Sequence, residues 1–345
     1  MINQFYFFIS TQLKQKRLQL TLKYGGFTLI ELLVAMVLAF LVITPLLGFM
    51  INIMDTDRKE QAKVNSEQEI QAALDYMAQD LQQAIYIYDG KGVKAILDQL
   101  PKATDRVPVL VFWKREFENQ VIDVKVGATS KGTNDGFVYS LVAYYLIKND
   151  PKSIWSDQFR IGRFALKDGV RDPDNPIKDG KPNYISGKEP DTGFKLFNLN
   201  DISGTLEEKM NAWKNSGKTP TNDAVTLIDY VDKSPTSADK VLDRVDCTTV
   251  FQDRNNKDTL QAKKDALRVP AFKSETYEYS NNTDLNNGSF YACIDSDKNL
   301  VKVFIRGNAL ARIDKSDKNT YASFRSTYFP SASTQVKGRG LIGLK

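Results

Sequence analysis

One carboxylate stands out by its position in the sequence. Glu31 is the only charged residue in an apolar run of 28 residues, 27–54. A carboxylate in an apolar membrane-spanning segment costs roughly 2.5–3.5 kcal/mol on insertion scales, so such residues usually have a partner. The chemistry that Glu31 offers is ion pairing with a cation at low dielectric, where opposite charges attract strongly.

The composition excludes most other chemistry. The sequence has no histidine, which excludes Ser-His-Asp and Cys-His catalysis and metal sites built on histidine. Two cysteines, Cys247 and Cys293, are too few for a four-cysteine zinc site or an iron–sulfur cluster. No P-loop, nucleophile elbow or paired-carboxylate motif is present. We therefore predict a protein that is not an enzyme.

A weak metal-binding pattern lies near the C-terminus, in the sequence Asp295-x-Asp297-x-Asn299. It resembles the opening of a calcium loop, which requires Gly at its sixth position and Glu at its twelfth. Those positions hold Leu300 and Arg306. A hairpin turn is the better interpretation, with calcium as the alternative, and no other cofactor is predicted.

The elements around Glu31 indicate a membrane protein. At about 1.5 Å per residue, residues 27–54 can cross a bilayer core of about 30 Å. Residues 1–26 carry four basic side chains and no acid, whereas the first charges after the run are Asp55 and Asp57. The positive-inside rule then predicts a single-pass inner-membrane protein with a cytoplasmic N-terminus and residues 55–345 outside. The other 319 residues carry 43 basic and 42 acidic side chains, so no nucleic-acid partner is predicted.

Two ordinary explanations of the apolar run leave something unaccounted for. A cleaved secretory signal has an apolar core of 7–15 residues followed by an A-x-A-like site, whereas this run is longer and ends in GFMINIMDTD. A plain signal anchor fits the length but gives Glu31 no role.

The segment Gly25-Gly26-Phe27-Thr28-Leu29-Ile30-Glu31-Leu32 resembles the prepilin signature of type IV pilins and type II secretion pseudopilins. The resemblance implies that a prepilin peptidase cuts between Gly26 and Phe27 and methylates the new amine of Phe27. It also implies that Glu31 pairs with the N-terminal amine of a neighbouring subunit. Other major and minor pseudopilins, an inner-membrane assembly platform and membrane lipid are the further partners implied.

Pro45 and Gly48 lie inside the apolar run. Because proline removes a helical hydrogen bond, we expect a kink or local melting near residues 41–48. The alternative is that both residues are simply tolerated in a membrane helix.

A second helical stretch follows, from Asp55 to about Ile87, and Asp89-Gly90 is expected to end it. Together the two stretches would form a helix roughly 90 Å long. Residues 73–89, ALDYMAQDLQQAIYIYD, are similar to the J-type minor pseudopilins of type II secretion. The longer run 39–89 is similar to pseudopilins of the cyanobacterial hormogonium polysaccharide secretion system. Its apolar positions recur at spacings of three and four: Ile70, Ala73, Leu74, Met77, Leu81, Ala84 and Ile85.

The remainder predicts an antiparallel sheet, so the fold class is α+β, with a long N-terminal helix packed on the sheet in a pilin-like layout. The domains are a leader (1–26), a membrane helix (27–54), an amphipathic helix (55–88) and an exported β-rich domain (89–345). Residues 167–221 form a loop-rich insertion, with a short helix around 206–213, or are disordered. Expected strands are 107–113, 121–126, 137–147, 159–166, 224–231, 289–294, 300–305 and 309–313.

Export would place Cys247 and Cys293 in an oxidising compartment, which favours a disulfide over two buried thiols. The predicted function is that of a minor pseudopilin, a structural subunit for envelope export, which the resemblance links to polysaccharide secretion and gliding motility. The alternatives are an adhesin or glycan-binding module on a pilin stem and, less favoured, a membrane-anchored enzyme.

Overall fold

The computed structural model describes residues 26–101, 103–126, 129–200, 203–235, 245–251, 265–271, 277, 283–314 and 319–340. The chain divides into two units, Met1–Thr56 and Asp57–Lys345. The helices are α2 (Leu29–Gln82), α3 (Gly90–Ile96), η1 (Leu97–Gln99), α4 (Leu206–Asn211), α5 (Cys247–Val250), η2 (Thr283–Asn286), η3 (Leu310–Arg312) and η4 (Ser323–Tyr328). The strands are β1 (Ala84–Ile87), β2 (Arg106–Val126), β3 (Thr129–Lys148), β4 (Phe159–Lys167), β5 (Ile177–Lys178), β6 (Lys181–Pro182), β7 (Val225–Val231), β8 (Arg268–Val269), β9 (Phe290–Asp295), β10 (Leu300–Arg306) and β11 (Ser331–Lys337).

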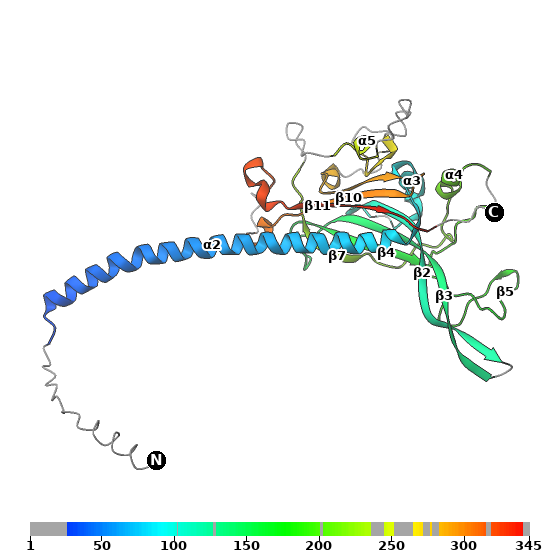
Figure 1. Cartoon of the computed structure of the whole chain (residues 1–345), viewed down its shortest axis with the longest axis horizontal. Coiled ribbons are helices and arrows are strands. Elements are labelled where there is room, and N and C mark those ends of the chain that lie inside the picture. The colour runs from blue at the N-terminus through cyan, green and yellow to red at the C-terminus, as the bar shows by residue number, and fades with distance from the viewer. Residues whose placement is uncertain are drawn as a thin grey trace, which may run out of the picture. The chain divides into compact units, whose positions relative to one another are not determined.

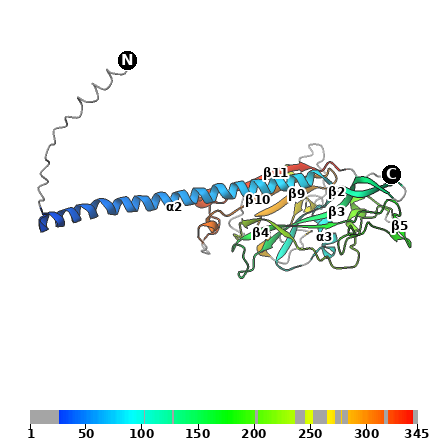
Figure 2. The ribbon, with the colours of Figure 1, turned by 90° about the horizontal axis from the view of Figure 1, so that it is seen from below.

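The two larger sheets of the second unit are antiparallel (Figure 1). A five-stranded sheet has the order β1-β2-β3-β4-β7, and a four-stranded sheet has the order β11-β10-β9-β8. The second half of α2 runs along these sheets in both ribbon views (Figure 2). The predicted α+β class, with a long N-terminal helix on antiparallel sheet, is therefore confirmed.

One face of α2 is buried where its apolar residues recur every three or four positions. The predicted stripe is buried throughout, and both sheets contribute to the same core. At the junction of the sheets, Gly307 leaves room for Ile70, because a Cβ on Gly307 would come within 2.8 Å of the Ile70 side chain. The periodicity of the sequence thus identified the surface on which the second unit folds.

The helix ends earlier than the sequence predicted. We expected it to reach about Ile87, but α2 stops at Gln82, and Ala84–Ile87 is strand β1, paired with β2. All four residues of β1 are buried. Because this run is bulky and apolar on both faces, it fits a buried strand as well as a helix, and pairing with β2 decides between them.

The Asp89-Gly90 pair begins a helix rather than ending one. The Asp89 carboxylate accepts a hydrogen bond from the Gly92 N–H, 2.8 Å away, and caps α3. An N-cap aspartate satisfies one of the free amides of the first turn. The sequence analysis missed α3, because Asp-Gly is also a common helix stop.

The strand predictions are mostly confirmed, with three corrections. The predicted strands 107–113 and 121–126 are parts of one strand, β2, which continues through the polar residues between them. The prediction of a strand at 309–313 is wrong, because this segment contains the short helix η3. Strand β11 was missed because its sequence, SASTQVK, is mostly polar and exposed.

The described residues of 167–221 are mostly loop, and several of them pack on the core. They include the short pair β5–β6 and helix α4, whose Thr205 and Glu208 make a capping box. Trp213 is buried and lies edge-on to Trp113, with ring centroids 5.6 Å apart. The Trp213 indole N–H also donates to the Lys195 carbonyl at 2.7 Å, so aromatic contacts hold the loop against the sheet.

A buried charge cluster joins α2 to three strands of the larger sheet; we call Asp80, Lys114, Tyr144 and Arg163 the Asp80 cluster. The Asp80 carboxylate accepts hydrogen bonds from Lys114 Nζ at 2.9 Å, Tyr144 OH at 2.6 Å and Arg163 Nε at 2.6 Å. Burial alone would raise the pKa of Asp80, but Arg163 and Lys114 hold that pKa below its ordinary value. The carboxylate is therefore charged and satisfied inside the fold.

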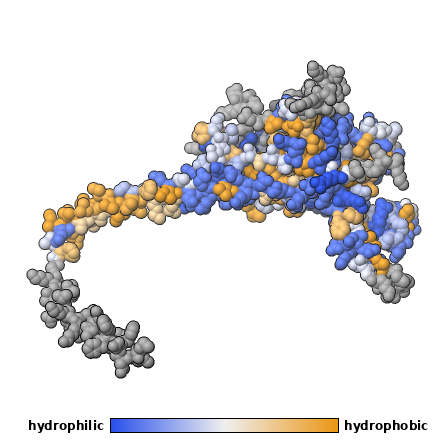
Figure 3. Space-filling model, viewed as in Figure 1, coloured by the Kyte–Doolittle hydropathy of each residue, from blue (hydrophilic) through white to orange (hydrophobic). Residues whose placement is uncertain are grey.

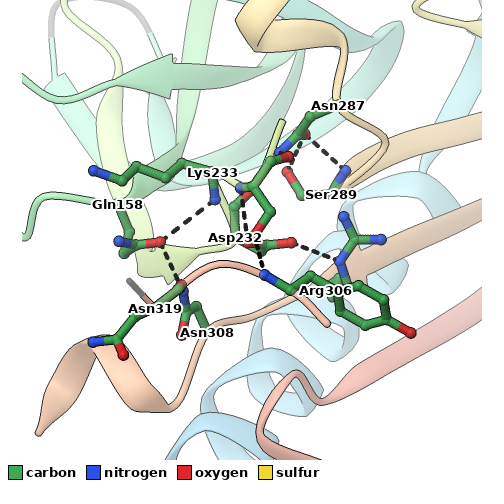
Figure 4. Close-up of polar contacts among 10 residues, drawn as sticks. Gln158, Asp232, Lys233, Asn287, Ser289, Arg306, Asn308 and Asn319 are labelled. Carbon is green, nitrogen blue, oxygen red and sulfur yellow. Dashed lines mark hydrogen bonds and ion pairs between the residues drawn. The ribbon is translucent and has the colours of Figure 1, made fainter. Parts of the chain in front are cut away.

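A second polar cluster joins the two sheets (Figure 4). Val231 at the end of β7 bridges to Gly307, just after β10. The next residue, Asp232, is fully buried, and one of its carboxylate oxygens accepts from Arg306 Nε at 2.8 Å. Asn287 donates to the Asp232 carbonyl at 2.7 Å. These bonds satisfy backbone and charged groups where the sheets meet.

Replacing Asp80 by alanine is expected to destabilise the protein by about 3 kcal/mol, because it leaves the cations of Lys114 and Arg163 buried without this carboxylate. The free energy of unfolding of the full chain in detergent, from denaturant titration, measures the effect. Asp75→Ala is the matched control, since Asp75 lies on the exposed face of the same helix and accepts a hydrogen bond from Gln71 one turn away. Equal losses in the two variants would show that the Asp80 cluster does not stabilise the fold.

The buried Asp89 carboxyl predicts a pH dependence of stability. Burial, with a smaller contribution from the nearby Glu207, raises the pKa of Asp89 to about 6 against the lowering effect of the Gly92 N–H. Because the folded state holds this proton more tightly than the unfolded chain, the associated stability is present below about pH 4 and is lost as pH rises through about 6.

Asp89→Asn, which can still cap α3, is expected to remove this dependence. The free energy of unfolding of the variant relative to the original should rise by up to about 3 kcal/mol between pH 4 and pH 7. Asp75→Asn, on the exposed face of α2, is the control. A constant difference between Asp89→Asn and the original across this range would contradict the assignment.

Candidate functional site

The described chain begins at Gly26, directly before the residues that start α2. Gly26 has no neighbouring atom within 4 Å of where a Cβ would stand, and Phe27 is 82% exposed. The helix begins at Leu29, so the Gly26–Phe27 bond lies in non-helical chain, two residues before the first helical residue. An exposed peptide bond in non-helical chain is accessible to a peptidase.

Thr28 and Glu31 form a reciprocal capping box at the start of α2. The Thr28 hydroxyl accepts from the Glu31 N–H at 3.3 Å, and the Glu31 carboxylate accepts from the Thr28 N–H at 3.4 Å. These bonds satisfy two amides of the first turn, and the carboxylate lies at the positive end of the helix dipole. Sequence analysis missed this role of Thr28, although the Thr-x-x-Glu spacing was sufficient to find it.

The apolar half of α2 is exposed along its whole length in the first unit (orange in Figure 3). Among the described residues, α2 is the one helix long and apolar enough to cross a membrane, and none of its most apolar window is buried. Exposed apolar surface on this scale requires lipid or other apolar helices as cover. The helix therefore fits a single-pass membrane anchor.

Pro45 and Gly48 lie within helix without interrupting it. The helical assignment is continuous from Leu29 to Gln82, so the expected local melting near residues 41–48 is wrong. Proline removes one amide donor, yet the rest of the helical hydrogen bonding continues around it. A kink at Pro45 and Gly48 stays a prediction.

Comparison with known families identifies the same segment. Residues 22–47 match the family model described as the prokaryotic N-terminal methylation motif. The chain carries a pilin-type methylation motif. This motif indicates a type IV pilin-like protein that a prepilin peptidase processes, in a class of structural, generally non-enzymatic subunits. Comparison with curated proteins and with solved structures found no match.

The other candidate residues lie far from this motif in the sequence. Cys247 and Cys293 are joined in a disulfide with their Cα atoms 5.3 Å apart, which ties α5 to β9. Asp295 and Asn299 belong to the β9–β10 turn: Asp295 accepts from the Lys298 N–H at 3.2 Å, and the Asn299 amide donates to the Ala84 carbonyl at 3.1 Å. Across the part of the chain described here, no group of three or more His, Cys, Asp or Glu residues could hold a metal.

Proposed function

We propose that the protein is a minor pseudopilin, a structural subunit that is cut after Gly26, methylated at Phe27 and assembled through its N-terminal helix. The observation that supports this most strongly is the methylation motif at the head of an exposed apolar helix that contains one carboxylate. Neither the motif nor the apolar helix would be sufficient alone, since a plain anchor also has an apolar helix. Together they account for the accessible bond, the helix and Glu31.

The proposed assembly step follows from the cost of an isolated carboxylate in an apolar environment. Among the described residues, Glu31 accepts hydrogen bonds from Thr28 at its own helix start. Cutting before Phe27 creates a charged amine four residues from Glu31, and a neighbouring subunit can present the same amine to this carboxylate. At low dielectric such a pair is strongly attractive and sets the register between adjacent helices.

The proposed orientation places residues 1–26 in the cytoplasm and residues 55–345 outside, following the charge asymmetry of the sequence. The proposed partners are a prepilin peptidase, major and minor pseudopilins, an inner-membrane assembly platform and membrane lipid. On resemblance, the machine exports material across the envelope. The finer proposals are that the material is a polysaccharide whose secretion is linked to gliding motility, and that the subunit is a J-type minor pseudopilin.

Processing predicts a defined N-terminus. Mass spectrometry of the membrane-extracted protein is expected to find a chain that begins at Phe27 with one added methyl group. Gly26→Glu should leave the leader attached, because it replaces the motif glycine directly before the cut with a large charged residue. A native chain that retains Met1, or that is cut elsewhere, would contradict the prepilin assignment.

Two substitutions separate the local and the intersubunit roles of Glu31. Glu31→Gln can retain the capping box but removes the charge, so we expect normal membrane insertion and loss of filament incorporation. Thr28→Ala removes the cap but keeps the carboxylate, so incorporation should persist with a slightly frayed helix start. Crosslinking of sheared filaments to the tagged protein measures incorporation. Normal incorporation of Glu31→Gln would contradict the pairing.

A further inference from the structure

A cleft of about 440 Å³ lies against one face of the smaller sheet, on strands β9, β10 and β11, with η4 and the segment after it along its side. It belongs to the second unit and is remote in sequence from the methylation motif. Its volume is within the range of small-ligand sites. The lining residues used in the argument are Tyr291, Phe304, Arg306, Tyr321, Phe329 and Ser333.

The cleft contains two pairs of aromatic rings. Tyr291 and Phe304 are stacked, with centroids 4.6 Å apart and planes within 4° of parallel. Tyr321 and Phe329 meet edge to face at 5.3 Å. Aromatic rings beside hydroxyl groups suit an amphipathic ligand whose apolar face lies on a ring while its polar edge makes hydrogen bonds. A pyranose ring has this character, and Ser333 supplies an exposed hydroxyl.

Arg306 supplies an unused donor at this cleft. Its Nε is bound to Asp232, as Figure 4 shows, but its Nη2 is buried and has no hydrogen-bond partner in the described structure. Buried donors are normally satisfied, so an orphaned guanidinium nitrogen points to an acceptor that arrives with a ligand. Because Nη2 is buried in this structure, a ligand can reach it only after a neighbouring side chain moves, and the Tyr321 ring centroid lies 5.6 Å from Arg306 Cζ.

The charges that face the cleft favour an anionic ligand, because the carboxylate paired with Arg306, that of Asp232, is fully buried and does not line the cleft. None of the described residues that line it is acidic, and Arg306 is the charged residue among them. Lys302 adds a second cation nearby, with its Nζ 5.2 Å from the centre of the Phe304 ring. A guanidinium group binds carboxylates well because its planar N–H donors match the carboxylate geometry.

We propose that this cleft binds an acidic saccharide. The sugar ring lies against the half-buried Phe304 and Tyr321 rings, its carboxylate accepts from Arg306 Nη2, and its hydroxyl groups bond to the Ser333 hydroxyl. The proposed ligands are uronate-containing glycans. The proposal does not depend on processing at Gly26, so the two can fail separately.

Isothermal titration of the full chain in detergent with trigalacturonate tests the proposal, with maltotriose as the neutral probe at the same ionic strength. We expect saturable binding of trigalacturonate and at least tenfold weaker binding of maltotriose. Absence of saturable trigalacturonate binding, or equal affinity for both sugars, would overturn the proposal.

Two substitutions on β11 locate the site. Ser333→Trp fills the cleft and should weaken trigalacturonate binding at least tenfold, whereas Gln335→Trp, an exposed position on the same strand outside the cleft, should leave it unchanged. Equal effects of the two would place the ligand elsewhere. Arg306→Lys retains a cation near Asp232 but lacks Nη2, and should reduce the preference for trigalacturonate over maltotriose. An unchanged preference would overturn the role of Arg306.

Discussion

The fold of the second unit depends on how one buried carboxylate is satisfied. Asp80 faces inward from α2, and each of three strands offers it a donor: Lys114 on β2, Tyr144 on β3 and Arg163 on β4. Apolar side chains on a helix can slide along a sheet at modest cost, but a buried charge with three directional bonds cannot. The Asp80 cluster therefore sets the register of α2 on the sheet, and the apolar stripe provides most of the buried area.

The ion pairs continue from this cluster along the β2–β3 hairpin. Lys114 also pairs with Glu116 at 2.6 Å, and Lys167 on β4 lies 3.6 Å from Glu116 and contacts Glu118. On the same hairpin, the Phe117 and Phe137 rings meet edge to face, with their centroids 5.5 Å apart. Paired charges and cross-strand aromatic contacts explain why β2 continues through a polar segment in which the sequence alone indicated a break.

Features that a contiguous segment encodes could be predicted, and features that distant segments assemble could not. The methylation motif, the apolar run and the α2 stripe are each local patterns, so sequence reasoning found them. The role of Asp80 could not be predicted, because an acidic residue on an amphipathic helix is expected on the solvent-exposed face. Its partners also lie 34, 64 and 83 residues away in the sequence. The cleft at Arg306 was beyond prediction for the same reason, since β9, β10, β11 and η4 build it together.

The segment after β11 returns to the place where α2 ends. The Arg339 N–H donates to the Gln82 carbonyl at 3.1 Å, and the Gly340 N–H donates to the Ala84 carbonyl at 3.1 Å. These two hydrogen bonds join residues about 255 positions apart in the sequence. Such long-range contacts form slowly. The sheet beside α2 is therefore finished only when residues 331–340 have reached the compartment in which the second unit folds. Until then, the chain exposes apolar surface that promotes aggregation.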